Sequence, residues 1–315
     1  MSAVAVAATP ARSVRKRRRI RPARVALHAF LITMVVVWLF PLAWATYISL
    51  RPLSDTIQHG YVSLPSNGLS LVNYQSAWTQ ADLPYYYLNT LVIAVPAVVL
   101  TLLLASMVAF ACTQFSWRFN LATLMIFTAG NLLPPQVIIV PLYRIYLATP
   151  IPVLGEIDIG KFAFPIFSDR GLLYDQYIGI MLIHIVFQTG FATFVLSNYM
   201  KTISKEITES AIVDGAHVLR IWWNIVLPLC RPALAAMATL LFTFIYNDFF
   251  WALILMKTGD KRPITSALNN LQGEFFVNNN LIAAGAMLVA IPPILVYIFL
   301  QKQFIAGLTL GSTKG

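Results

Sequence analysis

The chain has 315 residues, of which 58% are hydrophobic and only 11% are charged. A typical soluble domain is about half apolar and about a quarter charged, so this composition argues against an ordinary soluble enzyme. It indicates instead a protein whose solvent is partly lipid.

Six stretches are apolar for long enough to cross a hydrocarbon layer of about 30 Å, which takes about 20 helical residues. They lie at residues 25–50, 87–112, 121–143, 174–199, 232–256 and 281–300. Each is continuously apolar, whereas a barrel strand would alternate, so we expect an all-α membrane protein with six transmembrane helices. The first stretch contains Ala43-Trp44-Ala45, which resembles a signal-peptide cleavage site. Its length of about 26 residues exceeds that of a signal peptide's apolar region and predicts a retained span.

Positive charge is distributed unevenly between the two sides of this bundle. Fifteen of the 22 lysine and arginine residues fall in the two tails and in the connections after the second and fourth spans. Because the side richer in Lys and Arg faces the cytoplasm, both termini are expected there. The net charge of +10 therefore reflects orientation rather than nucleic-acid binding, although the basic residues before the first span would attract anionic lipid.

This reading divides the chain into a basic cytosolic tail at 1–24, a six-span domain at 25–306 with an inner loop at 201–231, and a cytosolic tail at 307–315. The outer connections at 51–86, 144–173 and 257–280 are long enough to meet a soluble partner. The alternative is that they only cap the ends of helices.

Nothing in the sequence predicts catalysis or metal binding by this chain. The two cysteines, Cys112 and Cys230, lie beside separate apolar runs, and the four histidines are not spaced as metal ligands. The string from Gly155 to Lys161 has the G-x4-G-K spacing of a phosphate loop, but the next residue, Phe162, has no hydroxyl for Mg²⁺. We therefore expect no catalytic residue, no metal site and no cofactor bound by this chain.

The inner loop has the signals of a short cytosolic helix. Ser204 is a candidate N-cap, acidic residues follow in the early turns, and Gly215 is a candidate stop. A second amphipathic segment, residues 218–226, follows and ends at Leu227-Pro228. We expect Ile207, Ala211 and Val213 to form a small apolar surface for a partner; the alternative is a helix that lies on the membrane.

This loop carries a resemblance to a known family. The loop contains Glu209-Ser210-Ala211, then after three residues Gly215, after nine more Ile225, and after one more Leu227-Pro228. This pattern resembles the E-A-A-x3-G-x9-I-x-L-P loop of permease subunits in binding-protein-dependent ABC importers. Ser210 replaces the usual second small residue, Ala, and keeps its small size.

Other strings extend the resemblance over residues 25–315. They are Leu133-Pro134-Pro135 through Pro141-Leu142-Tyr143, Tyr246-Asn247-Asp248-Phe249-Phe250-Trp251, and Gly307-Leu308-Thr309 with the terminal Lys314-Gly315. Together they are similar to the carbohydrate-uptake branch, in particular the smaller six-span permease of the maltose-type system. The long basic tail and an enlarged outer loop at 150–170 depart from that pattern.

The resemblance implies the fold of a type I ABC importer permease in a bacterial cytoplasmic (inner) membrane. It also implies a second permease subunit, two cytosolic ATPase subunits that use ATP and Mg, an extracytoplasmic solute-binding protein, and a sugar or oligosaccharide substrate. The residues implied to couple the permease to the ATPase are Glu209, Ser210, Ala211, Asp214, Gly215, Ile225, Leu227 and Pro228.

Asp248 is a carboxylate inside a predicted span, where it costs about 2.5–3.5 kcal/mol on insertion scales. We expect it to face the translocation path or the partner permease; the alternative is that it caps a helix or hydrogen-bonds to neighbouring spans. Residues considered for the path are Asn131, Gln136, Asn247, Asp248 and Trp251, and His184 and Gln188 are further polar residues within spans. The pairs Pro134-Pro135 and Pro292-Pro293 are expected to kink or break their helices.

An autonomous ion-coupled transporter or channel is the competing prediction. Such a carrier would need a relay of ionisable groups within the membrane, but Asp248 and His184 are nearly alone there. A membrane enzyme is less well supported, because the sequence offers no catalytic constellation.

Overall fold

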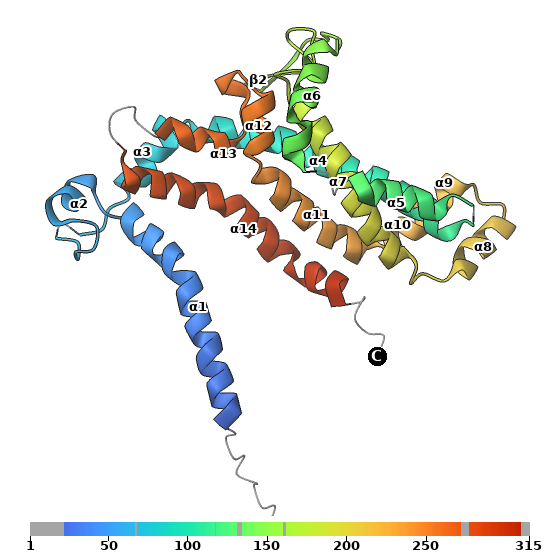
Figure 1. Cartoon of the computed structure of the whole chain (residues 1–315), viewed down its shortest axis with the longest axis horizontal. Helices are drawn as coiled ribbons and strands as arrows, with labels where there is room; N and C mark the ends of the chain where they lie inside the picture. The colour runs from blue at the N-terminus through green and yellow to red at the C-terminus, as the bar shows by residue number, and fades with distance from the viewer. Residues whose placement is uncertain are drawn as a thin grey trace, which may run out of the picture. The chain divides into compact units, whose positions relative to one another are not determined.

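The computed structural model describes residues 22–66, 68–116, 118–130, 134–159, 162–271 and 277–309. Helices form most of this part of the chain, and its two named strands form an antiparallel hairpin (Figure 1). The chain divides into two compact units, residues 1–47 and residues 48–315. The first contains almost all of α1 (Pro22–Ser49), whose apolar side chains are largely exposed, as expected of a helix that meets lipid.

Within the described residues, four helices are long and apolar enough to cross a membrane by themselves: α1, α4 (Leu83–Gln114), α7 (Tyr177–Met200) and the Asn279–Lys302 part of α14 (Asn279–Thr309). Helices α4 and α7 pack along one another, and α11 (Arg231–Tyr246) packs against both α4 and α14. The contact face of α4 contains the fully buried Ala94, Ala97 and Ala105. Small side chains at such positions let helix backbones approach closely within a membrane.

The predicted third and fifth spans are not continuous helices. Residues 121–143 were predicted as one span with a kink or break at Pro134-Pro135, and the break is confirmed, because α5 (Asn120–Gly130) and α6 (Pro135–Ala148) meet at 91°. Pro135 opens α6, where its missing N–H costs nothing. The predicted span 232–256 consists of α11 and α12 (Phe250–Leu255), which are separated by residues 247–249.

A second bent pair joins the last part of the predicted inner loop to the first part of the predicted fifth span. Residues Val218–Leu229 meet Arg231–Tyr246 at 79°. Counting each bent pair as one span brings the number of candidate spans in the described residues to six, the number predicted.

Helix α14 runs through Pro292 and Pro293 without a break, so of the expected kink or break only a kink stays a prediction. Each proline removes an N–H and frees the carbonyl four residues earlier. The hydroxyl of Tyr87 donates to the carbonyl of Leu288 over 2.7 Å, and that of Tyr246 donates to the carbonyl of Val289 over 2.8 Å. Two tyrosines therefore replace the lost helical donors, which keeps these carbonyls hydrogen-bonded within the bundle.

The predicted outer connections have secondary structure of their own. The first contains α2 (Leu53–His59) and α3 (Val72–Gln80), and the second contains β1 (Glu156–Ile159) and β2 (Phe162–Pro165). The third contains η2 (Gly259–Lys261), α13 (Ile264–Ala267) and η3 (Leu268–Leu271).

A buried ion pair holds the first of these connections. Arg51 and Asp55 are both fully buried, with Nη2 and Oδ2 2.6 Å apart. The backbone carbonyl of Arg51 also accepts a bond of 2.9 Å from Asn280 at the start of α14. Hydrogen bonds from the side chains of Ser66 and Arg51 lower the pKa of Asp55 to about 2.

Another polar network joins the second connection to the third. Lys261 Nζ lies 2.8 Å from Asp169 Oδ2 and donates to the carbonyl of Asp175 over 3.1 Å. Asp175 in turn accepts bonds from the backbone N–H groups of Lys257 and Thr258 over 2.7 and 2.8 Å. The long outer connections are thus fixed to each other and to the ends of the helices.

Candidate functional site

The predicted short helix of the inner loop is α8 (Lys205–Val213), and its ends are where the sequence places them. Ser204 Oγ accepts a hydrogen bond from the backbone N–H of Glu206 over 3.3 Å, which caps the amino end. At the other end Gly215 has φ of +80°, and the N–H groups of Gly215 and Ala216 donate to the carbonyls of Ile212 and Ala211. This is a Schellman motif, which favours glycine at its left-handed position.

The inward face of α8 is anchored to the bundle. Thr208 Oγ1 donates to Gln114 Oε1 at the end of α4 over 2.9 Å, and Gln114 Nε2 donates to the carbonyl of Met200 at the end of α7 over 3.2 Å. Ala211 is also buried on this face. The expectation that Ala211 contributes to a surface for a partner is therefore wrong for this structure, because Ala211 packs against its own chain.

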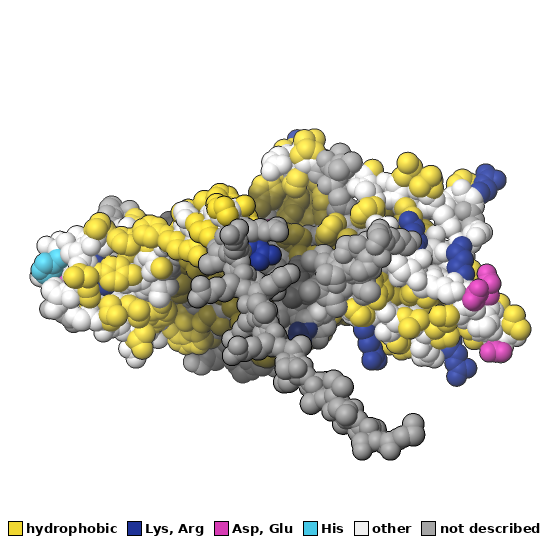
Figure 2. Space-filling view, turned by 90° about the horizontal axis from the view of Figure 1, so that it is seen from below, with side chains coloured by type: hydrophobic (Ala, Val, Ile, Leu, Met, Phe, Trp, Pro, Cys, Tyr) yellow, Lys and Arg dark blue, Asp and Glu magenta, His cyan; other side chains and the backbone are white. Residues whose placement is uncertain are grey.

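The outward face of α8 carries exposed acidic and apolar side chains together. Glu206, Glu209, Ser210 and Asp214 are exposed, and the described ion pairs involve none of the three acids. Val213 is 87% exposed. Figure 2 shows acidic side chains at the end of the molecule that holds α8. Unpaired charges around a bare apolar side chain are suited to contact with another protein.

The segment after α8 packs inward. It consists of α9 (Val218–Ile221), the π-helix η1 (Trp222–Val226) and α10 (Leu227–Leu229). Ile225, Leu227 and Pro228 are half-buried. The π-helix was not predicted; Pro228 cannot donate to the carbonyl of Asn224 and crowds it, which accounts for the wider turn.

Asp248 lies in the break between α11 and α12, and its carboxylate caps the second of these helices. Oδ1 and Oδ2 accept bonds from the backbone N–H groups of Trp251 and Ala252 over 3.2 and 3.3 Å. Thr265 Oγ1 donates to the backbone carbonyl of Asp248 over 2.6 Å. His184 Nε2 on α7 lies 3.4 Å from Oδ2. The alternative in which Asp248 caps a helix and contacts neighbouring elements is confirmed; its role in a translocation path stays a prediction.

The same carboxylate lies on the wall of a cavity of about 460 Å³. This cavity is lined by Pro135, His184, Phe187, Gln188, Phe191, Phe244, Asp248 and Trp251. Of the predicted path residues, the structure therefore brings Asp248 and Trp251 together, with His184 and Gln188 one helical turn apart on α7. Phe187, Phe191 and Phe244 were missed, because apolar residues in a span carry no signal that separates a cavity wall from a lipid contact.

The other predicted path residues do not line this cavity. Asn247 is exposed and donates to the carbonyl of Thr243 over 2.8 Å, and Gln136 is exposed beside Pro135. Asn131 lies outside the described residues.

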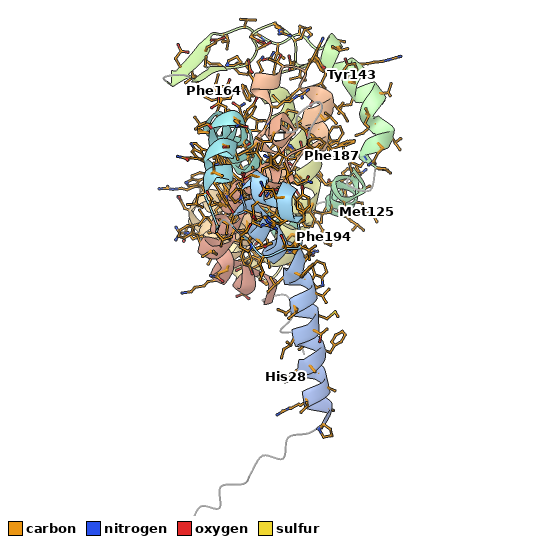
Figure 3. All side chains as sticks on the ribbon, turned by 90° about the vertical axis from the view of Figure 1, so that its left-hand side faces the viewer. His28, Met125, Tyr143, Phe164, Phe187 and Phe194 are labelled. Carbon is orange, nitrogen blue, oxygen red and sulfur yellow. The ribbon has the colours of Figure 1, made fainter. Side chains whose placement is uncertain are left out.

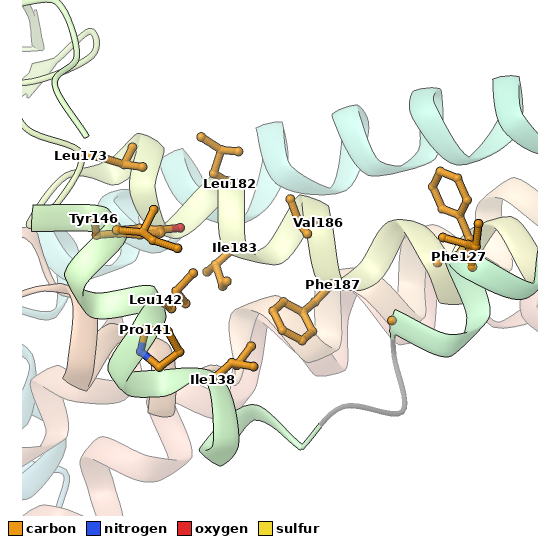
Figure 4. A pocket seen from close by; sticks show the side chains of 14 residues that line it. Phe127, Ile138, Pro141, Leu142, Tyr146, Leu173, Leu182, Ile183, Val186 and Phe187 are labelled. Carbon is orange, nitrogen blue, oxygen red and sulfur yellow. The ribbon is translucent and has the colours of Figure 1, made fainter. Parts of the chain in front are cut away.

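A larger cavity of about 650 Å³ lies between α5, α6 and α7 (Figure 4). Its described lining is apolar and includes Pro141, Leu182 and Val186, and no charged side chain is part of it. This wall is less suited to a polar solute than that of the smaller cavity. Elsewhere in the described residues, no group of three or more His, Cys, Asp or Glu side chains is placed to hold a metal ion.

Known proteins share this architecture. Residues 79–309 match the family described as "Binding-protein-dependent transport system inner membrane component". The osmoprotective compounds uptake permease protein GgtD of Synechocystis sp. is 29% identical and is covered over 92% of both chains. The melibiose/raffinose/stachyose import permease protein MelC of Bacillus subtilis is 29% identical over 78% of this chain and 82% of its own.

A solved structure has the same fold. It is the crystal structure of a bacterial ABC transporter involved in the import of the acidic polysaccharide alginate, with a TM-score of 0.71 and 22% identity over 94% of this chain and 100% of that chain. The all-α fold predicted from the sequence, that of an ABC importer permease, is confirmed. The chain therefore belongs to the family of binding-protein-dependent transport system inner membrane components.

Proposed function

We propose that this chain is a permease subunit of a bacterial ATP-driven importer for a sugar or oligosaccharide, and that it forms half of the translocation pathway. A second permease forms the other half, and an extracytoplasmic solute-binding protein delivers the substrate. Relatives such as the melibiose/raffinose/stachyose import permease of Bacillus subtilis support a saccharide substrate.

The exposed outward face of α8 is the observation that carries this proposal. Each of two cytosolic ATPase subunits receives one such helix in a groove, where Glu209 meets a basic or polar group and Val213 meets an apolar one. The inward face is fixed through Thr208 to the ends of α4 and α7. Closure of the ATPase pair then moves these helices together with α8, because packed helices shift between discrete arrangements rather than deforming smoothly.

The membrane orientation follows from charge. Both termini and α8 lie on the cytosolic side of the inner membrane, where the majority of the Lys and Arg residues are found. ATP and Mg are bound by the partner ATPase subunits and not by this chain. The polar networks of Arg51 and Lys261 then lie on the outer side, facing the binding protein.

Charge reversal at Glu209 tests the coupling role. The complete importer with Glu209→Lys is reconstituted in proteoliposomes, and ATP hydrolysis stimulated by the binding protein is compared with substrate uptake. We expect the variant to insert and assemble but to lose most of the stimulated hydrolysis, because a lysine would repel the group that Glu209 meets. Thr202→Lys, which places a lysine at an exposed residue of the same inner loop but outside α8, is the control.

Two outcomes contradict the proposal. Full stimulation of hydrolysis in Glu209→Lys would remove the coupling role of α8. Uptake that persists without internal ATP and without the ATPase subunits would identify the chain as an autonomous ion-coupled carrier or a channel.

A further inference from the structure

The cavity at the break between α11 and α12 combines features that together specify a ligand. We infer that it is a contact site for an uncharged sugar ring in transit, and that Asp248 makes it discriminate against anionic sugars. The inference rests on the proposed function and adds to it a location and a substrate class.

The first feature is a buried nitrogen that has no hydrogen bond. The side chain of His184 is 5% exposed and lines the cavity. Its Nε2 atom makes no hydrogen bond within the described residues, although Asp248 Oδ2 is 3.4 Å away. A buried polar atom without a partner is unfavourable, so the protein gains free energy when a small shift of the cavity wall lets a ligand hydroxyl bond to this nitrogen.

The second feature is the unused acceptor capacity of the carboxylate. A carboxylate offers about four lone-pair positions, and one backbone N–H group occupies a position on each oxygen of Asp248. The remaining positions suit hydroxyl donors, and the side-chain amide of Gln188 provides a further donor and acceptor on the cavity wall. Adjacent hydroxyls of a sugar ring present donors and acceptors at this close spacing.

The third feature is the set of aromatic side chains that line the cavity together with these polar groups. The rings of Phe187 and Trp251 have centroids 5.6 Å apart and are tilted by 39°, and Phe191 and Phe244 also line the wall. Ligand sites are typically mainly apolar and aromatic, with a few placed polar groups and volumes of about 300–1,000 Å³. The volume of about 460 Å³ lies within that range.

Charge defines the excluded ligands. Among the described residues that line the cavity there is no Lys or Arg, so the carboxylate of an acidic sugar would meet Asp248 without a compensating cation. A quaternary ammonium would suit the aromatic rings and the carboxylate of Asp248, but it could not use the hydrogen-bonding groups of His184 and Gln188. An uncharged, hydroxyl-rich ring uses both the aromatic and the hydrogen-bonding side chains.

Saturation-transfer NMR on the complete importer in nanodiscs, without its binding protein, tests this site. The probes are methyl α-D-glucopyranoside and methyl α-D-glucuronide, which differ in charge only at C6, with choline as a third probe. We expect at least tenfold more transfer to the glucoside than to the glucuronide. Asp248→Asn retains an oxygen for the cap and should raise the glucuronide signal at least fivefold.

Two α7 variants provide a matched comparison. Phe187→Ala should reduce transfer to the glucoside at least fivefold, whereas Phe194→Ala, on the same helix but not among the residues that line the cavity, should leave it unchanged. Figure 3 labels both phenylalanines. His184→Phe should also reduce it at least fivefold. All variants are first shown to co-purify with the partner subunits.

The inference is overturned if the wild-type importer prefers the glucuronide, if choline displaces the glucoside, or if Phe187→Ala and Phe194→Ala behave alike. Absence of transfer to the glucoside, in an importer whose ATP hydrolysis still responds to its binding protein, would also overturn it. That last result would leave the coupling role of α8 intact, so the two proposals fail separately.

Discussion

The anchor between α8 and the bundle depends on one hydrogen bond between side chains. Thr208 Oγ1 donates to Gln114 Oε1 over 2.9 Å, and both side chains are buried. Thr208→Val keeps the shape of the side chain and removes the donor, while every exposed residue of α8 stays as it is. The substitution therefore separates attachment of α8 to its own helices from the proposed contact of α8 with the ATPase.

The expected cost follows from the group that is left behind. Gln114 Oε1 would be buried without a partner, which costs about 1–3 kcal/mol. If this cost destabilises the state in which α8 packs against α4 and α7, local opening of α8 becomes about 5- to 150-fold more frequent. Adding Gln114→Leu removes the unpaired acceptor, and the carbonyl of Met200 still accepts a bond of 3.0 Å from Ile203 N–H. The double variant should therefore recover part of the loss.

Hydrogen exchange of the α8 amides and ATP hydrolysis stimulated by the binding protein measure the two consequences. Thr208→Val should speed exchange and lower stimulation several-fold, and the double variant should reverse part of both effects. Thr202→Val, at an exposed threonine that bonds only to a neighbouring carbonyl, is the control and should change little. Unchanged exchange in Thr208→Val, or losses that simply add in the double variant, would refute this account of the anchor.

Three further substitutions test other parts of the fold. Tyr246→Phe leaves the carbonyl of Val289 without its donor, so the free energy of unfolding in detergent titrations should fall by about 1–3 kcal/mol. Gly179→Ala would place a Cβ atom 2.6 Å from a backbone oxygen and should cost about 1–3 kcal/mol in the same assay, whereas Gly259→Ala meets nothing within 4 Å and should cost less. The pKa of Asp55 is about 2 in the folded protein and ordinarily 3.8, so its ionised form contributes stability that is complete above about pH 5 and is lost as the pH falls through 2. Asp55→Asn should therefore flatten the dependence of the melting temperature on pH between 5 and 2; an unchanged slope would contradict this.

The sequence was informative where structure depends on local chemistry. The lengths of the apolar runs predicted the long helices to within a few residues, because hydrocarbon thickness fixes how many apolar residues a span needs. The ends of α8 were predicted by Ser204 and Gly215, because each end requires one residue type at one position.

Breaks in the spans were harder to place. Apolar composition does not report helix direction, so residues 232–256 were expected to form one helix although they form two. The polar pair Asn247-Asp248 was the signal in the sequence that could have indicated this break, because Asn is common at the end of a helix and Asp is common as the cap of the next one. At Pro292 and Pro293 the helix does not break, and this could not be read from the sequence, because the tyrosines that satisfy the freed carbonyls come from α4 and α11, far away in sequence.

Contacts between residues far apart in the sequence could not be predicted from the sequence alone. Thr208 and Gln114 are 94 positions apart, and neither stood out in a single sequence. The inward direction of Ala211 was missed for the same reason, because a short helix with apolar residues on two sides gives no indication of which side is buried.

One helix, α7, joins the two sites proposed for this chain. The carboxyl end of α7 accepts, at Met200, the hydrogen bond from Gln114, which in turn holds α8. Sixteen residues earlier on the same helix, about 24 Å away at 1.5 Å per residue, His184 lies on the wall of the polar cavity. Helix α7 contains no proline, whereas the elements that it meets at the cavity, α6 and the α11–α12 pair, begin or break there. A displacement of α8 would therefore move α7 as one unbroken helix. At the cavity, α7 faces α6 and the α11–α12 pair, which begin or break there, so a change of shape at the cavity disrupts fewer helical hydrogen bonds than one elsewhere along α7.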